Sequence, residues 1–158
     1  MLEEFKFHPR RSVEQIEEGI ELAPKFGVDG LLPCVTSDAE TGEILMLGWM
    51  NAEALNLTIT TAEAHYFSRS RKGIWRKGEI SGLVQKVVEM RIDDDQDSIW
   101  LRVKVSKSGA SCHVGYRSCF YRRIPFGRES GQPLSFIETA KTFDPLLTYG
   151  KAPNPTRL

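Results

Sequence analysis

Two runs of alternating apolar and polar residues, joined by an acidic turn, constrain the fold of this chain most. Apolar side chains alternate with polar ones over residues 84–92, with one interruption, and the same period of two returns over residues 98–105. A period of two places one face of a strand in the core and the other face in solvent. The sequence therefore predicts a β-hairpin whose tip carries the acidic residues 93–97.

Further strands are predicted on both sides of this hairpin. Apolar stretches over residues 31–37 and 43–50 are separated by a turn-rich spacer, which predicts a second hairpin. A strand is expected over residues 66–70, followed by a glycine-containing loop, and a short last strand over residues 119–124. Together these elements predict a single-domain α+β fold of mainly antiparallel strands with a few short helices.

Two helix starts can be recognised from their capping residues. Ser12 and Gln15 have the spacing of a capping box, so a helix is expected there that ends before Pro24 or Gly27. Asn51 is a good N-cap for a second helix, which follows the second hairpin directly.

Length and charge restrict the class of protein. The chain has 158 residues, and its 21 basic residues balance its 21 acidic residues, which argues against a dedicated nucleic-acid coat. No apolar run approaches the ~18–20 residues of a membrane span, and the N-terminus lacks the apolar region of a secretory signal. We therefore expect a cytoplasmic protein with no membrane partner and without disulfides.

The acidic turn is a candidate site for a hard cation. Asp93, Asp95 and Asp97 are two residues apart, so in extended backbone they project to one side while Asp94 projects to the other. Converging carboxylates are the arrangement that Mg²⁺ or Ca²⁺ favours. A calcium EF-hand is excluded, because the sixth and twelfth positions lack its glycine and glutamate. A solvated acidic turn without a metal is the alternative.

Two of the three cysteines form a second candidate site. Cys112 and Cys119 are seven residues apart, and His113 follows the first of them. Taken alone, this spacing fits two buried free cysteines as well as a metal site, since it is not Cys-x-x-Cys. The acidic turn in the same chain favours a metal site. Cys34, in an apolar strand, is expected to be a core residue.

Two basic stretches accompany these candidate metal ligands. Residues 66–80 contain five basic residues and one acidic residue, and residues 117–128 contain four basic residues and no acid, so each has a net charge of +4. Arginine suits bidentate phosphate contacts, and aromatic side chains such as Trp75 can stack on a base. The pattern fits a pocket for a small ligand with two phosphates, a groove for single-stranded nucleic acid, or a solvated basic face.

Four ordered segments of the chain resemble the phosphoribosyl-AMP cyclohydrolases of histidine biosynthesis. The segments are Gly42–Leu55 (GEILMLGWMNAEAL), Tyr66–Arg71 (YFSRSR), Trp75–Gly82 (WRKGEISG, followed by Gln85) and Cys112–Phe120 (CHVGYRSCF). The resemblance spans about 29–122. It divides the chain into an N-terminal helical extension (1–28), the cyclohydrolase domain (29–124) and a C-terminal extension (125–158).

The resemblance implies a specific reaction and assembly. The family opens the adenine ring of 1-(5-phosphoribosyl)-AMP between N1 and C6, in the third step of L-histidine biosynthesis. It uses zinc and magnesium, and it works as an intertwined homodimer whose sites combine residues from both chains.

Carried onto this sequence, the resemblance assigns the candidate ligands. Asp93, Asp95 and Asp97 are expected to bind magnesium, and Cys112 and Cys119 are expected to bind zinc. Asp94 stands where the family has its third zinc-binding cysteine. A carboxylate there hardens the site, which weakens its preference for zinc over manganese, iron or cobalt.

The remaining residues of the site are assigned to catalysis and substrate binding. His113 is expected to move a proton onto N1 as the bond to C6 breaks. The expected substrate-binding residues are Arg69, Ser70, Arg71, Trp75, Lys77, Glu79, Ser81 and Gln85.

Other functions compete with this interpretation. The zinc nucleobase deaminases also attack a purine C6, but their His-x-Glu and Pro-Cys-x-x-Cys signature is absent from the sequence. A divergent paralogue with altered metal use and a nucleic-acid-binding module remain the alternatives.

Overall fold

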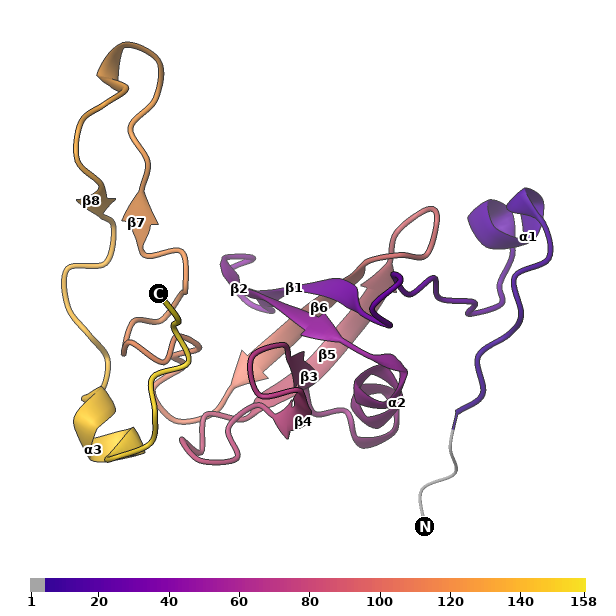
Figure 1. Cartoon of the computed structure of the whole chain (residues 1–158), viewed down its shortest axis with the longest axis horizontal. Helices are drawn as coiled ribbons and strands as arrows, with labels where there is room; N and C mark the ends of the chain where they lie inside the picture. Colours follow the sequence, from indigo (N-terminus) through magenta and orange to yellow (C-terminus); the bar gives the residue numbers. More distant parts are fainter. Residues whose placement is uncertain (1–4) are drawn as a thin grey trace.

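A four-stranded sheet forms the centre of the molecule in the computed structural model, which describes residues 5–158 (Figure 1). Its strands are β1 (Leu32–Asp38), β2 (Ile44–Met50), β5 (Gln85–Ile92) and β6 (Ile99–Val105), in the order β2-β1-β6-β5. β1 with β2 and β5 with β6 form the two predicted antiparallel hairpins, and β1 and β6 join them as a parallel pair. The predicted α+β class, built mainly of strands, is confirmed.

A smaller hairpin and one helix pack against this sheet. α2 (Ala52–Thr61) begins at the predicted cap, where the Asn51 side chain accepts a hydrogen bond from the Ala54 N–H at 2.8 Å. It packs against β2 and β3 (His65–Ser68). β3 pairs with β4 (Gly73–Arg76), which lies in a segment predicted to be a loop.

Among the described residues, Tyr66 is the largest fully buried side chain, and it connects the smaller hairpin to the four-stranded sheet. Its ring approaches the backbone of β2 so closely that a Cβ at Gly48 would lie 2.6 Å from Cδ1 of the ring. The Tyr66 hydroxyl donates to Oε1 of Gln85 at 2.6 Å, and Gln85 Nε2 donates to Ser111 Oγ at 3.1 Å. This buried network attaches the loop after β6 to the start of β5. Cys34 lies in the core as predicted, where burial raises its pKa to about 12.

The N-terminal segment contains one short helix, α1 (Val13–Glu18). The predicted capping box is present, because Ser12 accepts from the Gln15 N–H and Gln15 accepts from the Ser12 N–H. The helix ends at Glu18, earlier than predicted, since Gly19 adopts an extended conformation. Residues 1–4 of the predicted extension lie outside the described part of the chain.

The C-terminal segment projects from the body of the molecule and then returns to it (Figure 1). The predicted last strand is reduced to β7 (Arg122–Arg123), which pairs with β8 (Ser135–Phe136) in a projecting arm. The 3₁₀ helix η1 (Gly127–Glu129) lies between these two strands in the chain, and α3 (Pro145–Tyr149) follows them. Over residues 5–158, no helix is both long enough and apolar enough to cross a membrane.

Candidate active site

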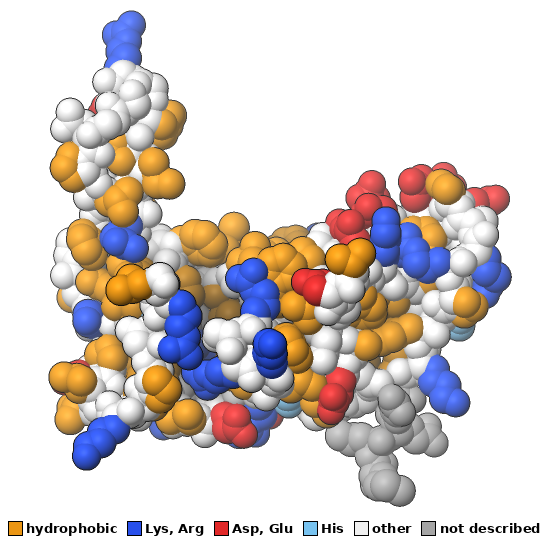
Figure 2. All heavy atoms as spheres, viewed as in Figure 1, with side chains coloured by type: hydrophobic (Ala, Val, Ile, Leu, Met, Phe, Trp, Pro, Cys, Tyr) orange, Lys and Arg blue, Asp and Glu red, His pale blue; other side chains and the backbone are white. Residues whose placement is uncertain are grey.

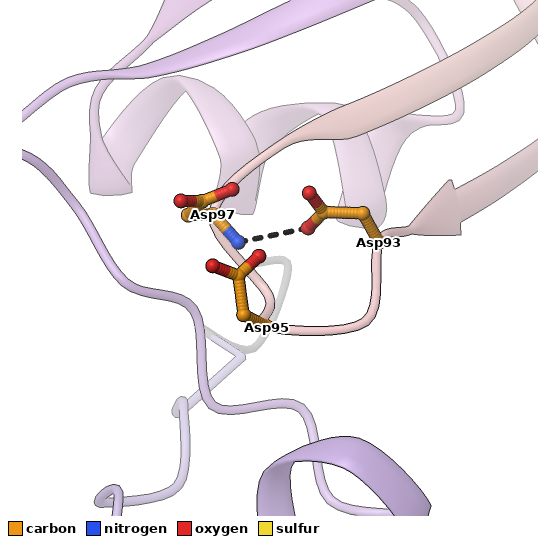
Figure 3. Close-up of side chains that lie close together, drawn as sticks. All are labelled: Asp93, Asp95 and Asp97. Atoms are coloured by element: carbon orange, nitrogen blue, oxygen red, sulfur yellow. Dashed lines mark hydrogen bonds between the residues drawn. The ribbon is translucent and has the colours of Figure 1, made fainter.

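The three predicted magnesium ligands converge at the tip of the β5–β6 hairpin (Figure 3). Asp93, Asp95 and Asp97 each offer an oxygen within 4.8 Å of the others. The backbone turns tightly here because Gln96 adopts a left-handed conformation, with φ 58°. Asp93 fixes the turn by accepting from the Asp97 N–H at 2.9 Å and from the Ser98 N–H at 3.0 Å.

The pKa values of this cluster reflect its like charges. Partial burial raises the pKa of Asp93, but hydrogen bonds from Ser98 and Asp97 outweigh this effect and hold it below its usual value. The pKa of Asp97 is raised by its hydrogen bond with Asp93 and by repulsion from Asp93 and Asp95. Carboxylates that repel each other in this way have the donor atoms and spacing that a hard divalent cation can neutralise.

The two predicted zinc ligands meet because the loop between them folds back on itself. The Ser111 N–H donates to the Arg117 carbonyl at 2.9 Å, and the Cys112 N–H donates to the Tyr116 carbonyl at 3.2 Å. The Cys119 N–H donates to the Leu45 carbonyl of β2 at 2.7 Å, which attaches the end of the loop to the sheet. Cys112 is buried and Cys119 is exposed.

A cation lies beside the cysteine pair. The Lys77 ammonium, one of the predicted substrate-binding groups, donates to the Ser111 carbonyl at 2.6 Å. A hydrogen bond from Cys119 and the charge of Lys77 lower the pKa of Cys112 to about 7, against the opposing effect of burial. The same hydrogen bond between the two thiols raises the pKa of Cys119. One thiolate therefore forms readily, and thiolate is the form that binds a transition metal.

His113 faces the same region. Among the described residues its buried Nε2 atom has no hydrogen-bond partner. Burial lowers the pKa of His113, the Asn154 side chain raises it by hydrogen bonding, and the charge of Lys77 lowers it.

The predicted substrate-binding residues fall into two groups. Arg69, Ser70 and Arg71 lie on the exposed turn between β3 and β4, where Arg69 stacks 4.8 Å from the centroid of the Trp49 ring. Figure 2 shows basic side chains gathered over this hairpin and acidic side chains over α1. Trp75 packs on Tyr66 with a centroid separation of 5.1 Å, so one face of its ring is covered.

The second group lies near the cysteine loop. It comprises Lys77, Ser81 and Gln85, while Glu79, between Lys77 and Ser81 in the chain, is exposed. Gln85 has no exposed surface and its side-chain amide is hydrogen-bonded within the chain, so it supports the loop rather than lining an open pocket.

The acidic turn and the cysteine loop lie at opposite ends of β5 (Figure 1). Ser111, next to Cys112, contacts Gln85 at the start of this strand, whereas Asp93 follows its end. The strand has 8 residues, which corresponds to roughly 25 Å at the usual rise per residue. The two candidate sites therefore do not combine within one chain.

Asp94 is correspondingly distant from the cysteines of its own chain. It lines a cleft of about 330 Å³ between the acidic turn and the N-terminal segment, together with Glu17 and Glu21. Within one chain, Asp94 does not complete the cysteine pair.

Several residues near the cysteine loop gave no signal in the sequence. Glu138 accepts hydrogen bonds from the loop backbone, Thr142 donates to the Gly115 carbonyl, and Asn154 lies beside His113. All three belong to the C-terminal extension, where no motif pointed to a site.

Comparison with known proteins shows to which family this chain belongs. A sequence model of the phosphoribosyl-AMP cyclohydrolase family matches residues 46–121, which contain the acidic turn and the cysteine loop. The chain is 55% identical to a phosphoribosyl-AMP cyclohydrolase of Rhodopseudomonas palustris (strain HaA2) over 141 residues, which are 89% of this chain and 94% of that protein. The chain belongs to the phosphoribosyl-AMP cyclohydrolase family.

Other cyclohydrolases of the family show the same degree of similarity. One from Rhodopseudomonas palustris (strain BisB5) is 51% identical over 89% of this chain and 94% of its own length, and one from Nitrobacter winogradskyi is 50% identical over 88% and 94%. The predicted family and the predicted enzyme class, a hydrolase of histidine biosynthesis, are confirmed.

Proposed function

We propose that this chain hydrolyses 1-(5-phosphoribosyl)-AMP between N1 and C6 of its adenine ring, as a cytoplasmic enzyme. The observation that carries the proposal is the cysteine pair with His113 beside it, in a chain 55% identical to a cyclohydrolase over most of its length. A nucleic-acid-binding module would need no such pair.

The cysteine loop fits a transition metal, but one chain supplies only part of the ligand set. A catalytic zinc site uses three protein ligands and an open position, and Cys112 and Cys119 provide two. A bound zinc ion would supply Lewis acidity and lower the pKa of water at the site. We expect Asp94 of the partner subunit as the third ligand.

This ligand set requires a homodimer with shared sites. Because the acidic turn and the cysteine loop lie at opposite ends of β5, a two-fold axis can bring the turn of each copy to the loop of the other. The three-carboxylate turn, with its oxygens within 4.8 Å, would hold magnesium beside the cysteine pair of the second copy.

His113 is the residue that we expect to move the proton. The oxygen of water bonds to C6, the electrons of the N1–C6 bond go to N1, and N1 takes up a proton. The unpaired Nε2 of His113 can accept the proton of the attacking water and return it to N1.

The substrate phosphates are assigned to the basic turn of the β3–β4 hairpin and to magnesium. Arg69 and Arg71 lie on that turn, exposed to solvent. Guanidinium groups in such positions can bind phosphate oxygens in pairs.

The choice of transition metal distinguishes two forms of the proposal. Asp94 in place of a thiolate favours altered metal use, with manganese, iron or cobalt in place of zinc.

The test is ring opening of phosphoribosyl-AMP by metal-stripped protein after addition of magnesium with either zinc or manganese. Activity with zinc would support the proposal with Asp94 as a working ligand, and activity with manganese alone would support the altered-metal form. Absence of turnover with zinc, manganese, iron and cobalt would overturn the proposed function.

A further inference from the structure

We propose that Glu138 is a positioning residue that sets the geometry of the two metal-binding thiols. The inference rests on the proposed function, in which Cys112 and Cys119 hold a transition metal. Glu138 lies in the C-terminal extension, outside the segment 46–121 that the family model matches.

The carboxylate of Glu138 binds two consecutive backbone groups of the cysteine loop. Its Oε1 accepts from the Arg117 N–H at 2.8 Å, and its Oε2 accepts from the Ser118 N–H at 3.0 Å. Ser118 is buried and immediately precedes Cys119. Glu138 itself is half-buried, whereas every other residue from 131 to 140 is exposed. The extension therefore enters the body of the protein at this side chain.

The opposite side of the same loop segment is fixed by β2. The Ser118 hydroxyl donates to the Ile44 carbonyl at 2.7 Å, and the Cys119 N–H donates to the Leu45 carbonyl at 2.7 Å. Residues 117–119 are consequently held between the sheet and Glu138. Without the carboxylate, the segment would keep its contacts to β2 and the bond from the Ser111 N–H to the Arg117 carbonyl, but the Arg117 and Ser118 N–H groups would lose their acceptor. The position of Cys119 relative to Cys112 would then be less tightly fixed.

Only a carboxylate satisfies both backbone donors. Charge-assisted hydrogen bonds to a carboxylate are stronger than neutral ones. A glutamine at position 138 would offer one carbonyl oxygen and would turn its NH₂ group toward the other N–H donor. An alanine would leave both donors without a partner from this side chain. The structure thus predicts graded effects of Glu138→Gln and Glu138→Ala.

The test measures metal affinity of the full chain by competition with a chromophoric zinc chelator, and thiolate ligation by the charge-transfer absorption of bound Cd²⁺. Loss of such a supporting partner typically weakens metal binding ~10–100-fold, which we expect for Glu138→Ala, with a smaller loss for Glu138→Gln. The charge-matched control Glu129→Gln lies on the exposed arm and should bind zinc like the original protein. Magnesium binding at the acidic turn should be unchanged in all three variants.

One further variant, Cys112→Ser, distinguishes failure of the proposed function from failure of the role of Glu138. Cys112→Ser should abolish the charge-transfer absorption, and if it binds zinc with the original affinity, the cysteine site of the proposed function is wrong and the role of Glu138 fails with it. The second outcome is that Cys112→Ser loses zinc binding while the zinc affinity of Glu138→Ala stays within about twofold of the original. A change this small lies well below the usual effect of losing a residue that supports a metal ligand, and it would overturn only the role of Glu138. Circular dichroism confirms folding, and where Glu138→Ala does not fold, Glu138→Gln decides on the same criterion.

Discussion

The imidazole of His113 is the candidate group for proton transfer beside the cysteine pair. It follows Cys112 directly, and its Nε2 is enclosed without a hydrogen-bond partner among the described residues. Buried polar atoms are rarely left unpaired. An unpaired ring nitrogen beside the cysteine pair is therefore available to a reacting group.

His113→Ala should lower turnover by about 10²–10⁴-fold, the usual contribution of a proton-transferring residue, and leave the metal content unchanged. Steady-state rates and metal analysis of the purified variant check both parts. His8→Ala, in the exposed N-terminal segment, is the control and should retain full turnover. Loss of metal from His113→Ala would instead identify His113 as a ligand.

For single residues, the sequence indicated which side chains can bind a metal or a substrate, but not the direction in which each side chain points. The cysteines and aspartates could be selected because few other residue types bind metals. Lys77 was predicted to bind the substrate, and its ammonium donates inward to the Ser111 carbonyl. Gln85 was also predicted to bind the substrate, and its side chain is buried in a network with Tyr66 and Ser111. A sequence shows the charge of a side chain but not the loop that folds over it.

At the level of elements, the acidic turn is attached to the N-terminal segment by Gln96. This side chain is 4% exposed, and its Oε1 accepts from the Ala23 N–H at 2.8 Å. Its Nε2 donates to the carbonyls of Ile16 and Glu21. The turn that carries the carboxylates is thereby fixed to α1 and the residues after it.

Gln96→Ala should therefore lower the free energy of unfolding by about 1–3 kcal/mol, because buried backbone groups lose their partner. Urea unfolding measures this change in free energy. The substitution should also increase the rate of amide hydrogen exchange more at residues 16–23 than in β5 and β6. Gln132→Ala, in an exposed segment, is the control. A change of about 0.5 kcal/mol or less, typical of surface positions, would show that Gln96 does not hold the segment.

Elements with local signals were predictable, and those that depend on distant partners were not. Ser12 and Asn51 mark helix starts through hydrogen bonds within three residues. One hairpin follows from alternation and the other from two apolar stretches, each around a short turn. β4 and the parallel pairing of β1 with β6 depend on contacts far apart in the chain. The two-residue strands of the projecting arm have too few residues to show a period.

At the scale of the whole molecule, the distance between the two candidate metal sites limits how an active site can be assembled from them. The acidic turn lies near α1, and the cysteine loop lies at the other end of the sheet, under the C-terminal extension (Figure 1). The family resemblance implied active sites that combine residues from both chains of a homodimer. β6 spans the sheet between them, so a shared site needs two copies of the chain.

The most direct test is to combine two inactive variants, Asp95→Asn and Cys112→Ser, in one heterodimer purified through two different tags. If each site takes its acidic turn from one copy and its cysteine pair from the other, one of the two sites is intact, and the heterodimer should show about half of the original activity. If each site were built within one chain, both sites would be defective. A heterodimer no more active than the single variants would contradict the account.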